Sequence, residues 1–352
     1  MIRLKVDNID IEVEEGRTIM DAALKAGIKV PTLCHMEGVE HYSSCMVCLV
    51  KDKIKNGFVP SCSALAQEGM DIDASGEDVI ELRTKAVELL LSEHRAECEA
   101  PCRIVCPAGY NIPQMNRLLA SDNYREAVEL VISELDSPEL RCITCPGYCE
   151  NACRRKKVDK TISIRNMKIF ISKNLNEFGG LDHPVPLSEY EDLRKRFSSR
   201  VGKLGDTEFK EWLKECTDEG RRFSDFSDFE TAGEEARSCM HCDCRAAADC
   251  QLRELAQAFG LKDKGNKVIN APVAKKINKN TGLIFENAKC IKCGLCVRVC
   301  EDSKDEPALC FTHRGFISII SEPLTEDFDN VLKTQTEKVI SVCPTGALAK
   351  FK

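Results

Sequence analysis

The sequence predicts an α+β protein of several domains. Its 352 residues exceed the roughly 150 that one domain usually holds. Apolar and charged residues alternate from Ile2 to Val13, as in two paired strands, whereas residues 77–97 repeat apolar side chains at helical spacing. The 22 cysteines fall into short motifs separated by long stretches. Strand and helix patterns therefore occupy different parts of the chain, and the cysteine motifs mark its segments.

Composition excludes several classes of protein. The N-terminus lacks the apolar core of a secretion signal, so clustered cysteines in so long a chain indicate metal binding rather than disulfides. No apolar run approaches the roughly 18 residues of a membrane span. The net charge of −7 argues against non-specific nucleic-acid binding as the main role. We therefore expect a cytoplasmic metalloprotein with no membrane span and no nucleic-acid partner.

Local patterns predict the individual elements. Asp7-Asn8 supplies the turn between strands 2–6 and 9–13, and Thr18 caps a short helix that ends at Gly27. The stretch from Gly179 to Pro186 has the composition of a loop. The other expected elements are helices at 77–97, on both sides of Ser121 within 112–135, at 162–175, 208–215 and 230–240, and strands at 281–286 and 316–320.

The first cysteine group suits a [2Fe–2S] cluster. Its spacing is C-x10-C-x2-C-x13-C, in a loop whose Gly38, Ser43 and Ser44 leave backbone amides free to face sulfur. This group and the hairpin before it resemble the N-terminal domain of the large iron–sulfur subunit of respiratory complex I and of some [FeFe] hydrogenases. That resemblance implies a β-grasp fold, and a structural zinc site is the alternative. The four ligands are Cys34, Cys45, Cys48 and Cys62.

A second group supplies seven cysteines and a histidine, close to the eight ligands of two [4Fe–4S] clusters. Cysteines four apart share one helix face. The segments CEAPCRIVCPAGYNIP and CPGYCENACRRKK resemble the helical two-cluster domain at the start of the glutamate synthase small subunit and of dihydropyrimidine dehydrogenase. The resemblance implies interleaved ligands. One cluster is then held by Cys98, Cys102 and Cys153, and the other by Cys106, Cys145 and Cys149.

Two positions depart from that family. His94 stands where the family has its first cysteine, and its helix also resembles complex I, in which a histidine ligates a cluster. Lys168 occupies the place of a ligating Gln or Glu, and a protonated lysine cannot ligate. We expect His94 to be a ligand, with an exposed helix-end histidine as the alternative, and Cys142 to replace Lys168. The basic run at 154–157 is typical of a solvated helix end.

A third group can close around one metal centre with the spacing C-x2-C-x-C-x5-C. It consists of Cys239, Cys242, Cys244 and Cys250. We expect a [4Fe–4S] cluster here. Zinc is the alternative, and His241 within the motif is a competing ligand.

The fourth group has the bacterial ferredoxin spacing C-x2-C-x2-C-x3-C, followed by a distant Cys-Pro. It resembles a two-cluster ferredoxin domain whose second motif keeps only its last cysteine. One [4Fe–4S] cluster is assigned to Cys290, Cys293, Cys296 and Cys343. Three roles are then open to Cys300: a buried thiol, a partner of Cys310 at a further site, or a replacement for Cys343 as a ligand.

Together the groups predict one [2Fe–2S] and three to four [4Fe–4S] clusters. The sequence contains no Gly-x-Gly-x-x-Gly fingerprint, P-loop or convincing nucleophile–base pair, so we expect no flavin or nicotinamide site and no catalysis by the chain alone. The resemblances imply an electron-transfer subunit of an oxidoreductase complex, including electron-bifurcating ones. Its partners would be a flavoprotein that handles NAD(P)H and a hydrogenase, a formate dehydrogenase or ferredoxin. A zinc-binding scaffold or regulatory protein and a self-contained reductase are the alternatives.

These assignments predict five segments. They are a β-grasp [2Fe–2S] domain at 1–75, an all-α helical ferredoxin domain with two clusters at 76–175, a helical connector at 176–235, a cysteine-rich cluster segment at 236–284 and a ferredoxin-like domain at 285–352.

Overall fold

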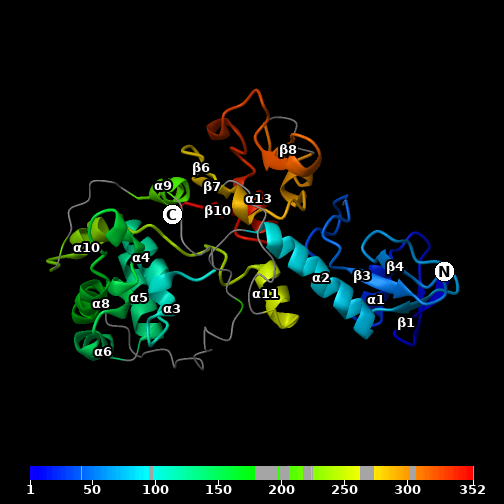
Figure 1. Ribbon diagram of the computed structural model, residues 1–352, viewed down its shortest axis with the longest axis horizontal. Helices are drawn as coiled ribbons and strands as arrows, with labels where there is room; N and C mark the ends of the chain where they lie inside the picture. The colour runs from blue at the N-terminus through cyan, green and yellow to red at the C-terminus, as the bar shows by residue number, and fades with distance from the viewer. Residues whose placement is uncertain are drawn as a thin grey trace. The chain divides into compact units, whose positions relative to one another are not determined.

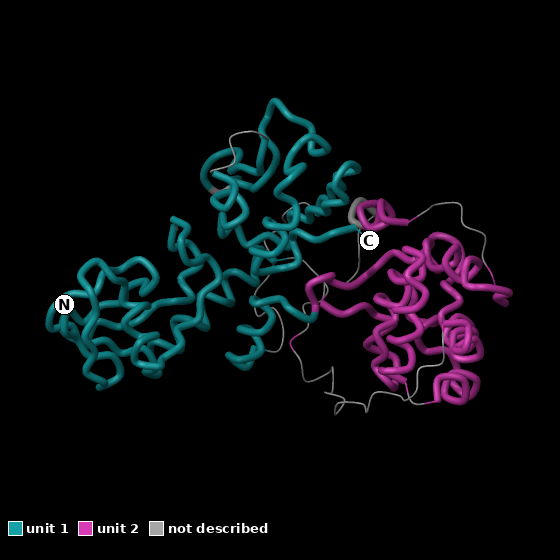
Figure 2. The backbone as a smooth tube through the Cα atoms, turned by 180° about the vertical axis from the view of Figure 1, so that it is seen from behind, with its two compact units in different colours: residues 1–95, 248–351 teal, residues 96–247, 352 magenta. Residues whose placement is uncertain are grey.

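The chain folds into two compact units. A computed structural model describes residues 1–40, 42–94, 98–135, 137–178, 197, 206–216, 223, 225–261, 273–301 and 307–351. The first unit joins residues 1–95 to 248–351, and the second spans 96–247 (Figures 1 and 2). The two ends of the chain, predicted as separate domains, therefore belong to one unit. The predicted loop from 179 to 186 lies outside the described residues.

A five-stranded mixed sheet forms the N-terminal part of the first unit. Its strands are β1 (Ile2–Val6), β2 (Ile9–Val13), β3 (Leu49–Asp52), β4 (Gly57–Pro60) and β5 (Asp71–Asp73), in the order β2-β1-β5-β3-β4. β1 and β2 form the expected antiparallel hairpin. Asp7 and Asn8 make its turn with φ of 46° and 67°, the left-handed conformation that matches the twist of the two strands. β5 pairs parallel to β1 and antiparallel to β3, so it ties the hairpin to the rest of the sheet.

Helix α1 (Ile19–Lys25) begins at the expected cap. The Thr18 hydroxyl accepts from the Asp21 amide at 3.1 Å, and the Asp21 carboxylate accepts from the Thr18 amide at 3.0 Å. The apolar face of α1 is buried in one core with residues of the sheet. That core includes Val6, Val13, Ile19, Ala22, Ala23, Val50 and Ile72.

Helix α2 (Glu77–Glu93) packs on the same part of the molecule. The Arg83 Nε donates to the Leu49 carbonyl of β3 at 2.8 Å. The helix ends at Glu93, earlier than the expected residue 97, because His94 adopts extended backbone. α2 therefore belongs with the N-terminal sheet rather than with a helical domain that begins at residue 76.

The C-terminal part of the first unit combines small sheets and short helices around its own core. Phe285, Val299, Leu332 and Val339 contribute to that core. Its strands are β6 (Lys275–Ile277), β7 (Leu283–Glu286), β8 (Cys310–Thr312), β9 (Ile319–Ser321) and β10 (Leu348–Lys350), in the sheets β10-β7-β6 and β8-β9. Its helices are α11 (Gln251–Ala258), α12 (Leu295–Arg298) and α13 (Thr336–Ser341). The strands expected at 281–286 and 316–320 are present in shorter form.

The described residues of the second unit form helices and no strands (Figure 1). The α-helices are α3 (Pro101–Ile104), α4 (Ile112–Ala120), α5 (Tyr124–Glu134), α6 (Pro138–Thr144), α7 (Tyr148–Asn151), α8 (Ile164–Lys173), α9 (Asp206–Leu213) and α10 (Phe229–Ala236). Most of the helices expected between 112 and 240 are therefore found, with ends shifted by a few residues. Met115, Val128, Met167 and Phe229 are among the side chains of their shared core.

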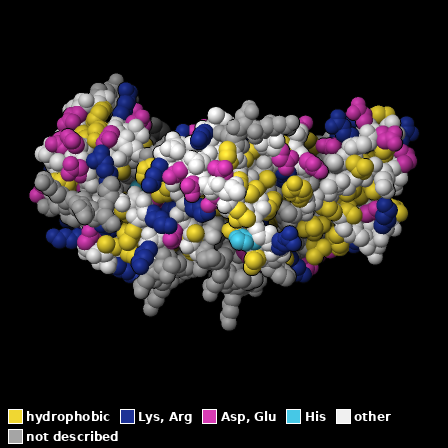
Figure 3. Space-filling model, turned by 90° about the horizontal axis from the view of Figure 1, so that it is seen from above, with side chains coloured by type: hydrophobic (Ala, Val, Ile, Leu, Met, Phe, Trp, Pro, Cys, Tyr) yellow, Lys and Arg dark blue, Asp and Glu magenta, His cyan; other side chains and the backbone are white. Residues whose placement is uncertain are grey.

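The surface carries both signs of charge. Figure 3 shows a face on which basic and acidic side chains are interspersed rather than gathered into blocks. Among the described helices, none combines the length and the apolar character that crossing a bilayer requires.

Helices α4 and α10 approach each other closely at a glycine. A Cβ added to Gly233 would lie 2.9 Å from the carbonyl oxygen of Leu119 on α4. Phe229, one turn earlier on α10, packs edge-on against Phe170 of α8 at 5.0 Å between ring centroids. The absence of a side chain at Gly233 therefore lets α10, and the cysteines that follow it, dock on the helical core.

We expect Gly233→Ala to destabilise the second unit, although alanine favours an isolated helix by about 1 kcal/mol over glycine. The added methyl would force α10 away from the Leu119 carbonyl. Thermal unfolding should show a lower midpoint than the wild-type chain has. Glu234→Ala, on the same helix, is the control and should leave the midpoint close to wild type. A midpoint for Gly233→Ala at or above the wild-type value would contradict this close packing.

Candidate iron–sulfur sites

The first cysteine group forms one buried cluster of thiols. Cys34 lies in the loop after α1, two more cysteines come just before β3, and Cys62 follows β4. Positive φ angles at Ser43 (50°) and Met46 (55°) turn this loop tightly around the sulfurs. The four thiols are at most 4% exposed. The sulfurs of Cys48 and Cys62 lie 3.3 Å apart, and the Ser43 hydroxyl lies 3.5 Å from the Cys62 sulfur.

Hydrogen bonds between these thiols set their acidity. Bonds with Cys45 and Cys62 hold the pKa of Cys34 well below its usual range, although burial opposes the shift. A bond with Cys62 likewise lowers the pKa of Cys48 to about 7. Two of the four sulfurs are therefore stabilised as thiolates by the other two. The thiolate is the form of cysteine that binds iron.

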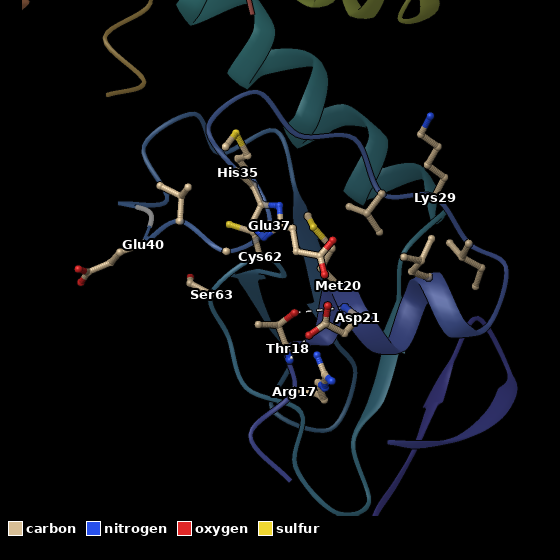
Figure 4. A pocket seen from close by; sticks show the side chains of 16 residues that line it. Arg17, Thr18, Met20, Asp21, Lys29, His35, Glu37, Glu40, Cys62 and Ser63 are labelled. Carbon is tan, nitrogen blue, oxygen red and sulfur yellow. Dashed lines mark hydrogen bonds between the residues drawn. The ribbon is translucent and has the colours of Figure 1, made fainter. Parts of the chain in front are cut away.

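An open pocket of about 740 Å³ lies beside this group (Figure 4). It is bounded by α1 and by the loop of residues 35–40. Of the four thiols, only that of Cys62 lines the pocket, next to Ser63. The wall carries cations and carboxylates, among them Lys29 and Glu37. Cys62 is therefore the ligand nearest to this opening.

The C-terminal group gathers Cys290, Cys293, Cys296 and Cys343 in the same unit. Burial, followed by the charges of neighbouring cysteines, raises the pKa of Cys290 and of Cys293 to about 12, and Cys343 is among those neighbours of both. Lys292, at φ 56°, turns its amide toward the Cys290 sulfur, to which it donates at 3.3 Å. Such amide donors are the groups that face cluster sulfur in ferredoxins.

Cys300 lies outside that set. It is 3% exposed and packs in the apolar core with residues such as Val299 and Leu309. Cys310 begins β8 and is partly buried. Of the three open roles, this position of Cys300 favours that of a buried thiol.

In the second unit, Cys106, Cys142, Cys145 and Cys149 surround the ammonium group of Lys168. Burial raises the pKa of Cys142, Lys168 lowers it, and Cys106 and Cys145 raise it further. Lys168 itself is 3% exposed, and the charges of Cys149, Cys142 and Cys106 raise its pKa against the effect of burial. Lys168 therefore remains a cation beside this group, where it offsets negative charge on sulfur.

A further group in the second unit brings together Cys102, Cys153, Cys239 and Cys242. Burial, and then the charges of Cys239, Cys242 and Cys153, raise the pKa of Cys102 well above its usual range. The four residues also line one small cavity. This grouping differs from the expected one, which combined Cys102 and Cys153 with Cys98 and kept residues 239–250 as a separate group.

Buried charged side chains position the loop that carries Cys239 and Cys242. Arg117 of α4 forms a two-fold ion pair with Asp243, with both N–O distances at 2.8 Å. Arg155 donates to the Ser238 carbonyl at 3.2 Å and to Asp159. Arg155 is only 1% exposed, so the expectation of a solvated basic run is wrong at this residue. The docking of α10 and these contacts explain why Cys239 and Cys242 meet Cys102.

The remaining expected ligands lie close in sequence to the points where the chain passes from one unit to the other. In the first unit, His94 ends α2 and Cys250 precedes α11, and these two helices pack together. His94 is 4% exposed, so the alternative of an exposed helix-end histidine is wrong. In the second unit, the Cys244 amide donates to the Cys98 carbonyl at 3.4 Å. His241 is buried, and this burial lowers its pKa to about 3.

The donor sets suit iron–sulfur clusters. Among the described residues, no three His, Cys, Asp or Glu side chains converge as they would around a single metal ion. Cluster ligands instead surround a small body of several iron atoms, and each of these groups consists of four thiols around such a space. Arg117, Asp243 and Arg298 were not found as contributors from the sequence, since a charged residue inside a cysteine motif is also typical of a solvated surface.

Three segments of the chain match iron–sulfur domain families. Residues 1–76 match the 2Fe-2S iron-sulfur cluster binding domain, 82–179 match the 4Fe-4S domain II of dihydropyrimidine dehydrogenase, and 283–349 match the ferredoxin-like domain of NADH-quinone oxidoreductase subunit 3. These matches confirm the resemblances stated from the sequence. They also confirm that the chain is an iron–sulfur protein with one [2Fe–2S] domain and [4Fe–4S] domains.

Similar proteins are subunits of redox enzymes. The gamma subunit of the NAD-reducing hydrogenase HoxS of Cupriavidus necator is 26% identical over 42% of this chain and 64% of its own. One subunit of the NADH-quinone oxidoreductase of Rhizobium meliloti is 32% identical over 28% and 12%. The NADPH-Fe(3+) oxidoreductase alpha subunit of Geobacter sulfurreducens is 30% identical over 41% and 18%. The chain therefore spans less than two thirds of each relative.

The fold also resembles a solved structure. It superimposes with a TM-score of 0.52 on a chain from the crystal structure of an NAD+-reducing [NiFe]-hydrogenase in the H2-reduced state. The match covers 99% of this chain and 87% of that chain, at 17% sequence identity. The arrangement of helices and strands is therefore shared well beyond the cysteine motifs.

We expect Asp243→Asn to disturb the Cys239–Cys242 loop strongly. It leaves Arg117 buried without its anionic partner, which costs about 3–5 kcal/mol of unfolding free energy. Denaturant unfolding and iron content per chain are the measurements, and both should fall. Asp122→Asn is the control, because its pair with Arg237 is exposed and contributes at most about 1 kcal/mol. Equal effects of the two variants would contradict a buried role for Asp243.

Proposed function

We propose that this chain is a multi-cluster electron-transfer subunit of an oxidoreductase complex. It relays single electrons between a flavoprotein partner that handles NAD(P)H and a second redox centre, such as that of a hydrogenase, a formate dehydrogenase or a ferredoxin. The three matched domains and the subunit relatives support this role. Further support comes from sixteen cysteines that fall into four groups of four, each enclosed by protein as a cluster site requires.

The observation that carries the proposal is the meeting of two cysteine groups in the first unit. One guanidinium nitrogen, Nη2 of Arg298, donates to the carbonyl of Cys34 at 3.1 Å and to that of Cys293 at 3.0 Å. Met36 and Val39, from the loop of the first group, pack against the C-terminal core. Two redox centres held by these loops would be close neighbours, as a relay requires.

Each bound cluster would supply one-electron transfer. The residues that would hold it are, for the [2Fe–2S] centre, those of the first group in a β-grasp domain, and Cys290, Cys293, Cys296 and Cys343 in a ferredoxin-like domain. In the helical domain they are the sets that contain Cys106 and Cys102. Their role is to bind iron, exclude water by burial and fix the spacing of the centres. Amides such as that of Lys292 and the cation of Lys168 adjust the potential.

Anaerobic purification of the chain, alone and with its native partners, tests this function. The chain should be coloured, contain iron and sulfide in equal amounts, and give EPR signals of reduced [2Fe–2S] and [4Fe–4S] centres. It should accept electrons from NAD(P)H only in the presence of a flavoprotein. Colourless protein with zinc and no iron would instead establish the scaffold role. Turnover of NAD(P)H with a dye by the chain alone would establish a self-contained reductase.

Cys343 and Cys300 should differ sharply as ligands. Cys343→Ala is expected to remove one [4Fe–4S] centre, about four iron atoms per chain, because it takes away one of four thiolates. Cys300→Ala is the matched control and should keep its iron, since Cys300 lies in the apolar core. Iron analysis and EPR of both purified variants measure this. Iron loss from Cys300→Ala, with full iron in Cys343→Ala, would exchange their roles.

Cys142 and Lys168 should also separate by experiment. We expect Cys142→Ala to lose about four iron atoms from the second unit, because Cys142 completes the set with Cys106, Cys145 and Cys149. Lys168→Gln keeps all four thiols and should retain the iron while lowering the potential of that centre. A redox titration followed by EPR measures both quantities. Full iron in Cys142→Ala would show that this thiol is not a ligand.

A further inference from the structure

Arg298 occupies an unusual position between the two cysteine groups of the first unit. It lies at the end of α12 and is 4% exposed. Its Nη2 binds a carbonyl from each group, that of Cys34 and that of Cys293. Its guanidinium also lies 4.7 Å from the ring centre of Tyr42, which belongs to the loop of the first group. One buried cation is thus held by both cysteine loops at once.

Two nitrogens of the same guanidinium lack a protein partner. Nε and Nη1 of Arg298 are buried, and neither makes a hydrogen bond within the described part of the chain. Leaving such donors unsatisfied away from water costs free energy, so buried donors are normally paired. No carboxylate forms an ion pair with Arg298 among the described residues. The acceptors that the surroundings supply are cysteine sulfurs and whatever those sulfurs bind.

We propose that Arg298 is a positioning residue that couples the two redox centres: it fixes the distance between their loops and stabilises the reduced form of both. The inference rests on the proposed function, because it takes each of the two cysteine groups to hold a cluster. Reduction adds one electron to a centre and neither forms nor breaks a bond. The added negative charge is stabilised by the guanidinium charge and by its unpaired N–H groups.

The location of the cation makes the expected effect specific. A charge beside one centre would shift the potential of that centre mainly, whereas a charge held between two loops shifts both in the same direction. Arginine suits this place because it stays protonated and carries five donors in a fixed plane. The ring of Tyr42 and the nearby backbone of Gly294 restrict its movement. A Cβ at Gly294 would lie 3.6 Å from that ring.

Arg298→Gln in the complete chain tests the coupling. Both centres should keep their iron, and both should become harder to reduce. At a fixed solution potential, we expect the ratio of reduced to oxidised centre to fall about tenfold for each, which corresponds to about 59 mV for a one-electron couple. EPR-monitored redox titration measures this ratio for the [2Fe–2S] and [4Fe–4S] signals separately. Arg298→Lys, which keeps the charge, should recover part of both shifts.

Lys338→Gln provides the matched control. Lys338 lies in the same part of the unit and donates to the Val299 carbonyl at 2.5 Å, so the change removes a cation without touching the first group. Its [2Fe–2S] potential should equal that of the wild type. Unchanged potentials in iron-loaded Arg298→Gln, or a shift of one centre alone, would overturn the inference.

Two further outcomes are distinguishable. If Arg298→Gln loses iron, Arg298→Lys decides instead: a smaller shift of both potentials supports the coupling, and a shift of one or neither overturns it. A wild-type chain that binds no iron under anaerobic conditions would reject the proposed function itself. Wild-type clusters with potentials indifferent to Arg298 would reject only the coupling.

Discussion

The structure depends on the burial of sulfur. Thiols enclosed by protein resist ionisation, as the raised pKa values of Cys290, Cys293 and Cys102 show, yet iron binds only the thiolate. Folding around such groups and binding iron are therefore coupled, because the metal replaces the protons that burial would otherwise retain. The hydrogen-bonded pairs of the first group reduce this cost locally, since one thiol of each pair stabilises its neighbour as a thiolate.

Buried cations provide the second part of the same balance. Lys168 stands among four cysteines, Arg117 and Arg155 hold the loop that brings Cys239 to Cys102, and Arg298 joins two loops. Each offsets negative charge in a place that water cannot reach. Arranged in this way, positive side chains influence both where a centre forms and how readily it accepts an electron.

Sequence patterns predicted what local chemistry decides. The hairpin at Asp7-Asn8, the cap at Thr18 and the four-thiol motifs at 34–62 and 290–296 are all set by residues close in the chain. The group of Cys102, Cys153, Cys239 and Cys242 could not be predicted in this way. It depends on Gly233 allowing α10 onto α4 and on an ion pair between residues 126 positions apart. The role of Arg298 was hidden for the same reason, because the Cys34 carbonyl that it binds lies 264 residues away in sequence.

The central claim is that these buried thiols anchor iron in neighbouring centres. Diffraction data collected at the iron absorption edge from anaerobic crystals test it most directly. We predict strong iron peaks enclosed by each four-cysteine group, including a two-iron peak among Cys34, Cys45, Cys48 and Cys62. Sulfur–sulfur bonds within a group, or lone zinc peaks in place of iron, would contradict the account.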